Sequence, residues 1–253
     1  LRFHRPLSLA STPQQYDRPP FTPWPDRDPD LIESAAALAQ TRGIARTTQE
    51  AFAVKSHAKA LAARFQDELT GVADLARDEF ARQLNPRVCS RLPVISGDSA
   101  HGLTAATIAV QADAAAAVVL VSERMASRLS VPWSMRLHAS RRMGGAPDLP
   151  PLAGIAPAQA LLSMVNQNVV AAIELMESFA VQAMVWQEAL DLDPLNVNRG
   201  GGSLARGHPI GASGAILAVR LFHELRYESE GAFGLAAIAA AGGLGSAALF
   251  ERT

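Results

Sequence analysis

The pattern of apolar and polar positions predicts two helices in the first third of the chain. Thr47-Thr48-Gln49-Glu50 has the Thr-x-x-Glu spacing of a capping box and opens a strongly helix-forming stretch. We therefore expect a helix from about Thr47 to Phe65. A second helix is expected from about Val72 to Gln83. It should end before Asn85-Pro86, because proline disfavours the helical conformation of the residue that precedes it.

Short uncharged runs farther along predict buried strands. The run Ala116–Val121 closes a stretch with almost no charge and suits a strand that is buried on both faces. The run Val169–Leu175 is also typical of a short buried strand. It would deliver Met176-Glu177-Ser178-Phe179 at its end, and sites in α/β sheets gather at strand ends.

The last third of the chain predicts a glycine-rich loop, a helix and a hairpin. Glycines crowd between residues 200 and 214, and the stretch that follows carries leucines at i, i+4 and i+8, which form one apolar stripe of a helix: Leu217, Leu221 and Leu225. Two apolar runs, Gly234–Ala239 and Gly245–Phe250, are joined through Gly242-Gly243. We expect two core strands that turn on this flexible backbone. Three further segments complete the expected order. They are a proline-rich surface arm at 1–29, a proline-bearing loop at 147–157 and a stretch of helical character at Ala158–Met164.

Composition narrows the class of protein. The chain has 253 residues, 49% hydrophobic but only 6% aromatic, which favours closely packed layers of an α/β protein. Lys plus Arg (23) nearly balances Asp plus Glu (24), so no overall field favours nucleic acid or an anionic membrane. No apolar run approaches the roughly 20 residues of a membrane span. The single cysteine, Cys89, cannot form an internal disulfide framework and suits the cytoplasm; we expect it to serve packing.

One long motif carries a family resemblance. The run VNRGGGSLARGHPIGASGA at Val197–Ala215 resembles the thiolase signature Asn-x-x-Gly-Gly-x-x-x-x-Gly-His-Pro-x-Gly-Ala-Ser-Gly. It lacks the Gly-Lys-Ser/Thr ending of a P-loop and the Gly-x-Gly-x-x-Gly spacing of a dinucleotide fold, which argues against nucleotide binding. Other segments are similar to thiolase segments and follow in the family's order: 43–57, 104–123, 174–182 and 234–251.

The resemblance implies the thiolase fold, a layered α/β/α/β/α body built from two similar βαβαβαββ halves with a loop domain inserted in the first. Residues 1–93 would form the loop domain, 94–124 the last strand segment of an incomplete first half, and 125–253 the complete second half. A sheet without most of its strands exposes apolar surface and unpaired edges. We therefore expect the missing N-terminal half to come from another chain or from a preceding segment.

The resemblance also implies chemistry on acyl-CoA thioesters. In thiolases one cysteine, from the N-terminal half, carries the acyl group and a second, at the hairpin, shuttles a proton. The catalytic positions retained here are His208, which would activate the acyl-carrying cysteine or donate to the thioester oxygen, and Glu177, which could equally act as a base or satisfy backbone amides. The substrate-binding positions implied are Ala109, Ser178, Phe179, Ala180, Ala241 and Gly243, with the N–H near Ala241 in an oxyanion hole.

Several positions depart from the family's pattern. Ala239 stands where the hairpin cysteine would be, and Met176 where an asparagine holds a water. A related subfamily places its proton-shuttling cysteine at the position of Ser178, a far weaker acid, and Ala109 replaces a serine that lines the pantetheine. The first hypothesis is a thiolase-superfamily acyltransferase whose thiolytic activity is weak or lost. The alternative is a catalytically degenerate subunit that binds acyl-CoA or completes an assembly.

The implied partners are acyl-CoA or CoA, the missing N-terminal half and further copies of the chain in a dimer or tetramer. No separate cofactor is implied, because the CoA thioester is itself the substrate. No metal is expected either, since no cluster of histidine, cysteine and carboxylate residues has ligand spacing.

Overall fold

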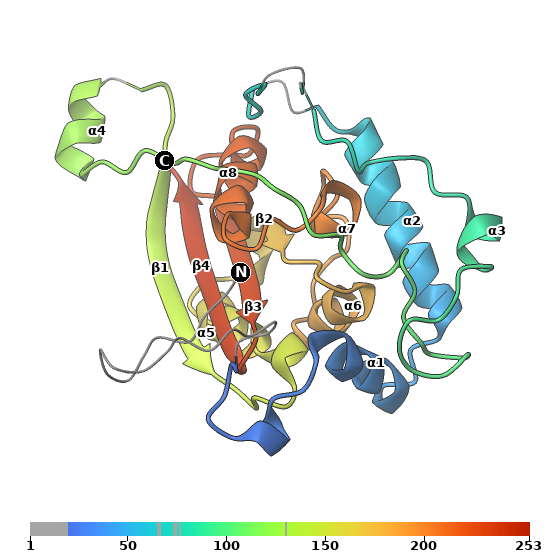
Figure 1. Ribbon diagram of the computed structural model, residues 1–253. Coiled ribbons are helices and arrows are strands. Elements are labelled where there is room, and N and C mark those ends of the chain that lie inside the picture. Colours follow the sequence, from blue (N-terminus) through green and yellow to red (C-terminus); the bar gives the residue numbers. More distant parts are fainter. Residues whose placement is uncertain (1–19, 65–66, 73–74, 76, 130) are drawn as a thin grey trace, which may run out of the picture.

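The computed structural model describes residues 20–64, 67–72, 75, 77–129 and 131–253. Its centre is a four-stranded sheet in the order β1-β4-β3-β2 (Figure 1). The strands are β1 (Met135–Gly144), β2 (Val170–Leu175), β3 (Phe233–Ala240) and β4 (Leu244–Arg252). β4 pairs antiparallel with both β1 and β3, whereas β2 and β3 are parallel.

Helices cover both faces of this sheet and build a second group beside it (Figure 1). In chain order they are η1 (Pro25–Arg27), α1 (Leu31–Thr41), α2 (Arg46–Ala62), α3 (Pro86–Cys89), α4 (Glu123–Leu129), η2 (Pro150–Leu152), α5 (Ile155–Leu162), η3 (Gln167–Val169), α6 (Ala180–Ala189), α7 (Ser203–Arg206) and α8 (Ser213–Leu225). From β1 onward the main elements follow as β1-α5-β2-α6-α8-β3-β4. Val197 adds an isolated parallel bridge to Ile173 between α6 and α8, where a third strand of a βαβαβαββ unit would fall.

Two apolar clusters hold the helices to the sheet. On one face the leucine stripe of α8 packs against Ala172, Met176 and Ala236. On the other face α5 and α6 contribute Leu161 and Trp186, which pack with residues of β2, β3 and β4. Trp186 is fully buried, and its indole N–H donates to the carbonyl oxygen of Pro151 at 2.7 Å. The sheet is therefore the middle layer of three, as an α/β fold requires.

The helices α1 and α2 form the group beside the sheet. A third cluster joins the alanine face of α1 to Phe179, Val181 and Val185 at the start of α6. α2 contacts both α6 and α7, and Arg46 at its start donates to the carbonyl oxygens of Cys89 and Leu92. These contacts carry α2 to the end of β2, where the candidate site lies.

Most local patterns gave the element that they predicted. The strand at 169–175 is β2, the leucine stripe is α8, the hairpin is β3–β4, and the helical stretch at 158–164 is α5, which begins a few residues earlier. The helix expected at 47–65 is α2, which ends at Ala62. An arm was expected at 1–29. Positions 1–19 of it lie outside the described residues.

The capping-box prediction was wrong. α2 begins after Ala45, whose side chain makes no cap, and Glu50 instead accepts a hydrogen bond from Arg46 at 2.7 Å. This ion pair is an i, i+4 contact within α2, and Arg46 also donates to the segment around α3. The carboxylate that the capping box would have used is therefore engaged along the helix.

The helix predicted at Val72–Gln83 was also wrong, since the described residues of that range form no helix. Val72 and Leu75 pair with each other in a small bridge and are 71% and 52% exposed. A helix of this length needs an apolar face packed on a neighbour, and these residues bury none.

The strand predicted at Ala116–Val121 does not form either. The segment has no regular secondary structure, and Val119 and Leu120 are 89% and 85% exposed. A strand exists through hydrogen bonds to a neighbouring strand, and no strand in the described part of the chain lies next to these residues. The composition predicts a buried strand, and the described residues contribute no strand that pairs with it.

Candidate active site

The end of β2 carries the first group of site residues. Val170–Leu175 is a buried apolar run, paired along its length with β3, and Met176 extends this pairing by donating its N–H to the carbonyl oxygen of Ala237 at 3.0 Å. Met176 and Glu177 are buried, whereas Ser178 is partly exposed. Phe179 precedes the first turn of α6 and is buried in the cluster with α1.

A short segment, 107–110, joins this strand end to the turn Gly207-His208-Pro209, which we call the histidine turn. The N–H of Ala109 donates to the carbonyl oxygen of Ser178 at 3.0 Å, and the N–H of Ala180 donates to that of Thr107 at 2.9 Å. On its other side the N–H of His208 donates to the carbonyl oxygen of Val110 at 2.7 Å. The structure thus brings together His208 and the predicted positions on 107–110 and at the end of β2.

The contacts of His208 favour one tautomer. Its Nδ1 lies 2.8 Å from the hydroxyl oxygen of Ser213, which in turn lies 3.1 Å from the carbonyl oxygen of Pro209. Both contacts can be hydrogen bonds at the same time only when Nδ1 carries the proton, and this tautomer leaves a lone pair on Nε2. Burial lowers the pKa of His208 below its ordinary value of 6.5, which favours the neutral imidazole.

Glu177 is enclosed by hydrogen-bond donors. Its Oε2 accepts from the hydroxyl of Ser56 at 2.7 Å and its Oε1 accepts from Nδ2 of Asn198 at 2.7 Å. Its backbone N–H donates to the hydroxyl of Ser203 at 3.1 Å. Burial raises the pKa of Glu177, while the hydrogen bonds from Asn198 and Ser56 oppose that shift. Both carboxylate oxygens are therefore engaged with partners from outside β2.

Asn198 connects this carboxylate to β2. Its Oδ1 accepts from the N–H of Leu175 at 2.8 Å, and its Nδ2 also donates to the carbonyl oxygen of Leu175 at 3.0 Å. The side chain thus satisfies the backbone of the last residue of β2. It does so with a positive φ of 44°, a conformation that asparagine tolerates better than most residues.

The glycine-rich loop lets other groups approach its backbone closely. A Cβ on Gly202 would lie 2.2 Å from the carboxyl carbon of Glu177, and one on Gly201 would lie 2.4 Å from the carbonyl oxygen of Ser56. Gly201 also has a φ of +72°. Two of these glycines are thus required because Glu177 and helix α2 occupy the space of a side chain.

The turn of the β3–β4 hairpin supplies backbone and no titratable side chain. Ala239 pairs with Gly245 next to the turn, and its methyl group packs half-buried against the cluster beneath α5. Ala241 and two glycines of positive φ form the turn, and a Cβ on Gly243 would lie 2.7 Å from the carbonyl oxygen of Gly145. No hydrogen bond among the described residues joins this turn to His208. Among the described residues, the pairing of β3 with the end of β2 links the hairpin to the site.

Four polar residues of the site were not singled out from the sequence. Asn198 and Ser213 lie inside the signature at Val197–Ala215, so the motif contained a signal for them. Ser203 is also within it, at a position where the family pattern is variable. Ser56 lies in an ordinary amphipathic helix and carries no local signal at all.

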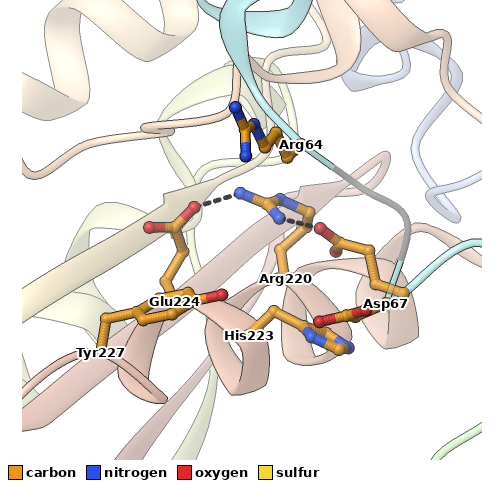
Figure 2. A pocket seen from close by; sticks show the side chains of 7 residues that line it. Arg64, Asp67, Arg220, His223, Glu224 and Tyr227 are labelled. Atoms are coloured by element: carbon orange, nitrogen blue, oxygen red, sulfur yellow. Dashed lines mark hydrogen bonds and ion pairs between the residues drawn. The ribbon is translucent and has the colours of Figure 1, made fainter.

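A second cluster of charged side chains lies at the far end of α8 (Figure 2). A cavity of about 260 Å³ is lined by Arg64, Asp67, Glu68, Arg220, His223, Glu224 and Tyr227. Buried Arg220 forms ion pairs with Glu68 and Glu224, and its Nε lies 3.9 Å from Oε1 of Glu174. Burial raises the pKa of Glu174 to about 7.

This cavity is separate from the histidine turn. His208 precedes the first turn of α8, and the cavity lies about ten residues farther along that helix, or about 15 Å at 1.5 Å per residue. Its ion pairs join the segment at 67–68 to α8, which is a structural role. The described residues contain no group of histidine, cysteine and carboxylate side chains that could hold a metal ion, and no helix of theirs is both long and apolar enough to cross a membrane.

A helix-covered mixed sheet with a Gly-His-Pro turn beside a strand end defines a layered α/β fold of the thiolase type. The family described as "Thiolase, C-terminal domain" matches residues 136–252. A putative acetyl-CoA C-acetyltransferase of Bacillus subtilis, YhfS, is 32% identical over 93% of this chain and 67% of its own length. A probable acetyl-CoA acetyltransferase of Escherichia coli is 35% identical over 87% of this chain and 59% of its own.

Solved structures agree with the sequence relatives. The crystal structure of the Bacillus anthracis acetyl-CoA acetyltransferase matches with a TM-score of 0.81 and 27% identity, over 89% of this chain and 62% of that one. The chain belongs to the thiolase family. It spans about two thirds of the length of the Bacillus subtilis relative and less of the Escherichia coli protein and the solved structure.

Proposed function

We propose that the protein is a thiolase-type acyltransferase that acts on acyl-CoA thioesters, with carbon–carbon bond chemistry weak or lost. The observation that carries this proposal is the contact of His208 with Ser213, which satisfies both hydrogen bonds of the Ser213 hydroxyl when Nδ1 carries the proton. In that tautomer Nε2 is available as a proton acceptor. The relatives named as acetyl-CoA acetyltransferases support the substrate class.

In the proposed reaction Nε2 of His208 takes the proton of a cysteine thiol that the N-terminal thiolase half supplies. The thiolate attacks the thioester carbonyl carbon, and backbone N–H groups at the hairpin, near Ala241 and Gly243, stabilise the resulting oxyanion. The carbon–sulfur bond to CoA then breaks, and His208 returns the proton to the departing thiolate. The acyl group remains on the cysteine, and no cofactor other than CoA takes part.

Making or breaking a carbon–carbon bond requires a second acid/base, which removes or returns the α-proton of the acyl group. Ala239 occupies the hairpin position where the family carries a cysteine, and a methyl group cannot transfer a proton. Met176, at the end of β2, cannot hold a water as an asparagine amide would. Acyl transfer or thioester hydrolysis therefore remains feasible, while thiolysis should be slow.

The proposed organisation follows from surface that the described chain leaves uncovered. Residues 1–93 would be a loop domain, 94–124 a strand segment of the first half, and 125–253 the second half. Val119 and Leu120 are largely exposed and need sheet neighbours, which the N-terminal half would provide. We also propose a homo-oligomer, a dimer or tetramer, in the cytoplasm. Intact-mass spectrometry with light scattering tests this, and a lone monomer of 26.7 kDa that unfolds cooperatively would contradict it.

The decisive experiment is mass spectrometry of the whole protein after incubation with acetyl-CoA. An added acetyl group on a cysteine, removed again by free CoA, is the expected result. A second candidate function, a degenerate subunit that binds acyl-CoA without reacting, is favoured by Ala239 and Met176. It predicts binding of CoA by calorimetry with no acetyl adduct at any time.

A further inference from the structure

Helix α2 reaches into the candidate active site through one buried side chain. Ser56 is 3% exposed, and its hydroxyl donates to Oε2 of Glu177 at 2.7 Å. The hydroxyl oxygen of Ser56 also accepts a hydrogen bond from the backbone N–H of Gly202 at 3.1 Å. A serine hydroxyl has one proton, so Ser56 donates that proton to the carboxylate and accepts the hydrogen bond from the glycine.

Two further contacts hold α2 against the glycine-rich loop. Lys59 lies about one helical turn after Ser56. Its Nζ donates to the carbonyl oxygen of Val197 at 2.7 Å. Gly201 lies so close to α2 that a Cβ there would be 2.9 Å from Ala60. The contact is thus continuous along the first residues of the loop and does not depend on a single hydrogen bond.

Glu177 is built into this contact as an acceptor on both sides. Ser56 donates to one carboxylate oxygen and Asn198 donates to the other, so the group joins α2 to the loop that follows α6. Each carboxylate oxygen is thus engaged with a donor from the protein. A charged acceptor with two donors is suited to hold its surroundings in place, and hydrogen bonds to charged groups are among the stronger ones.

The loop that Ser56 and Glu177 hold leads directly to the histidine. Gly202 accepts from the N–H of Arg206 at 3.2 Å, and Ser203 accepts from that of Gly207 at 2.8 Å. A single short helical turn therefore separates the anchored Gly202 from His208. The far end of the turn is held by Val110 and Ser213, so Gly202 at one end and these two contacts at the other together set the position of the imidazole.

We propose that Ser56 and Glu177 are positioning residues, which together hold Gly202 and thereby set the place of the His208 imidazole. Helix α2, in the proposed loop domain, is then part of the scaffold of the active site as well as a cover for substrate. The consequence for activity rests on the proposed acyl-transfer function. The structural part of the proposal is that the Ser56 hydroxyl keeps the 199–208 segment in place, and this part is independent of that function.

The test compares Ser56→Ala with Ser34→Ala in the whole protein. Ser34 is a matched control because it is 4% exposed, lies on neighbouring α1 and donates one buried hydrogen bond, to the carbonyl oxygen of Asp148 at 3.1 Å. In Ser56→Ala we expect amide hydrogen exchange in the peptide 199–208 to be at least ~10-fold faster, as for loss of a hydrogen bond to a charged group. Acetyl transfer should lose ~10-fold in kcat with less than ~2-fold change in KM, which is the signature of a displaced catalytic group. Ser34→Ala should change neither.

Glu177→Gln keeps the shape of the side chain but puts an NH₂ group opposite Ser56 or Asn198 in either orientation of the amide. It should lower kcat by a similar factor. The double variant Ser56→Ala, Glu177→Gln should be no worse than the poorer single variant, because both remove one shared anchor. Unchanged exchange at 199–208 in Ser56→Ala, or multiplicative losses in the double variant, would overturn the proposal. A wild-type protein that forms no acyl-enzyme would refute the proposed function, and hydrogen exchange would still decide the role of Ser56.

Discussion

The histidine turn and the β3–β4 hairpin belong to the same fold, yet their side chains differ greatly. In the turn, His208 has a defined hydrogen-bond partner, and the loop before it is held by buried polar side chains. In the hairpin, Ala239 keeps its pairing with Gly245 but carries only a methyl group. Strand pairing uses the backbone, so it is compatible with any small side chain at this position. The family fold by itself therefore does not determine which of the family's reactions the chain carries out.

The largest effect is expected from removing the imidazole. His208→Ala should lower the rate of acyl-enzyme formation by at least ~10²-fold, because no other group in the turn can accept the thiol proton. The measurement is the time course of the acetyl adduct by mass spectrometry. His138→Ala on exposed β1 is the control and should react at the wild-type rate. An adduct that forms at the wild-type rate in His208→Ala would show that this histidine is only structural and would favour the non-catalytic subunit.

The hairpin should show the opposite behaviour. Wild-type cleavage of acetoacetyl-CoA with free CoA should be at least ~10²-fold slower than in ordinary thiolases, since in the proposed function Ala239 supplies no second acid/base. Ala239→Cys should raise that rate by about 10-fold or more in a steady-state assay. Ala240→Cys places a thiol one residue farther along the strand, on its other face, and should have no effect. If the wild-type protein cleaves acetoacetyl-CoA at the rate of an ordinary thiolase, the hairpin does not limit the chemistry, and the contrast with the histidine turn is wrong.

Glycines of the signature should differ sharply in their tolerance of a methyl group. Gly202→Ala would place a Cβ 2.2 Å from the carboxyl carbon of Glu177, and we expect about 2–3 kcal/mol lower free energy of unfolding. Gly214, in the first turn of α8, has nothing within 4 Å of its Cβ position, so Gly214→Ala should be stabilising by about 0.5 kcal/mol. Urea unfolding measures both. Equal tolerance would mean that the loop is less tightly held than the hydrogen bonds of Glu177 indicate.

The smallest effect is a shift in pH dependence. The proposed reaction needs neutral His208, and burial lowers the pKa of this group below its ordinary value of 6.5, so less than half of the imidazole is protonated at pH 6.5. The rate of acyl-enzyme formation should therefore change less than ~2-fold between pH 7.5 and 6.5 and fall at lower pH. Stopped acetylation reactions at several pH values give the profile, with circular dichroism to confirm that the fold persists. An acid limb centred above pH 7 would contradict the role of His208 as a base.

Local sequence pattern determined the elements whose signal is contained within a few neighbouring residues. The leucine stripe of α8, the apolar run of β2 and the glycine turn of the hairpin all formed where the pattern predicted. The signature likewise indicated His208 together with the loop before it. These features depend on the periodicity of side chains or on the conformations that glycine permits, which are properties of the chain itself.

Tertiary structure decided everything that depends on partners distant in sequence. Ser56 and Glu177 are 121 positions apart, and nothing in the helix around Ser56 marks it as a site residue. β1 carries arginines and a histidine and was not predicted, because only its pairing with β4 makes it a strand. The segment Ala116–Val121 has the composition of a buried strand and yet is exposed, because a strand needs a neighbour to accept its hydrogen bonds. The sequence by itself determined which residues could do chemistry, and only the folded contacts decided which of them are held in place to do it.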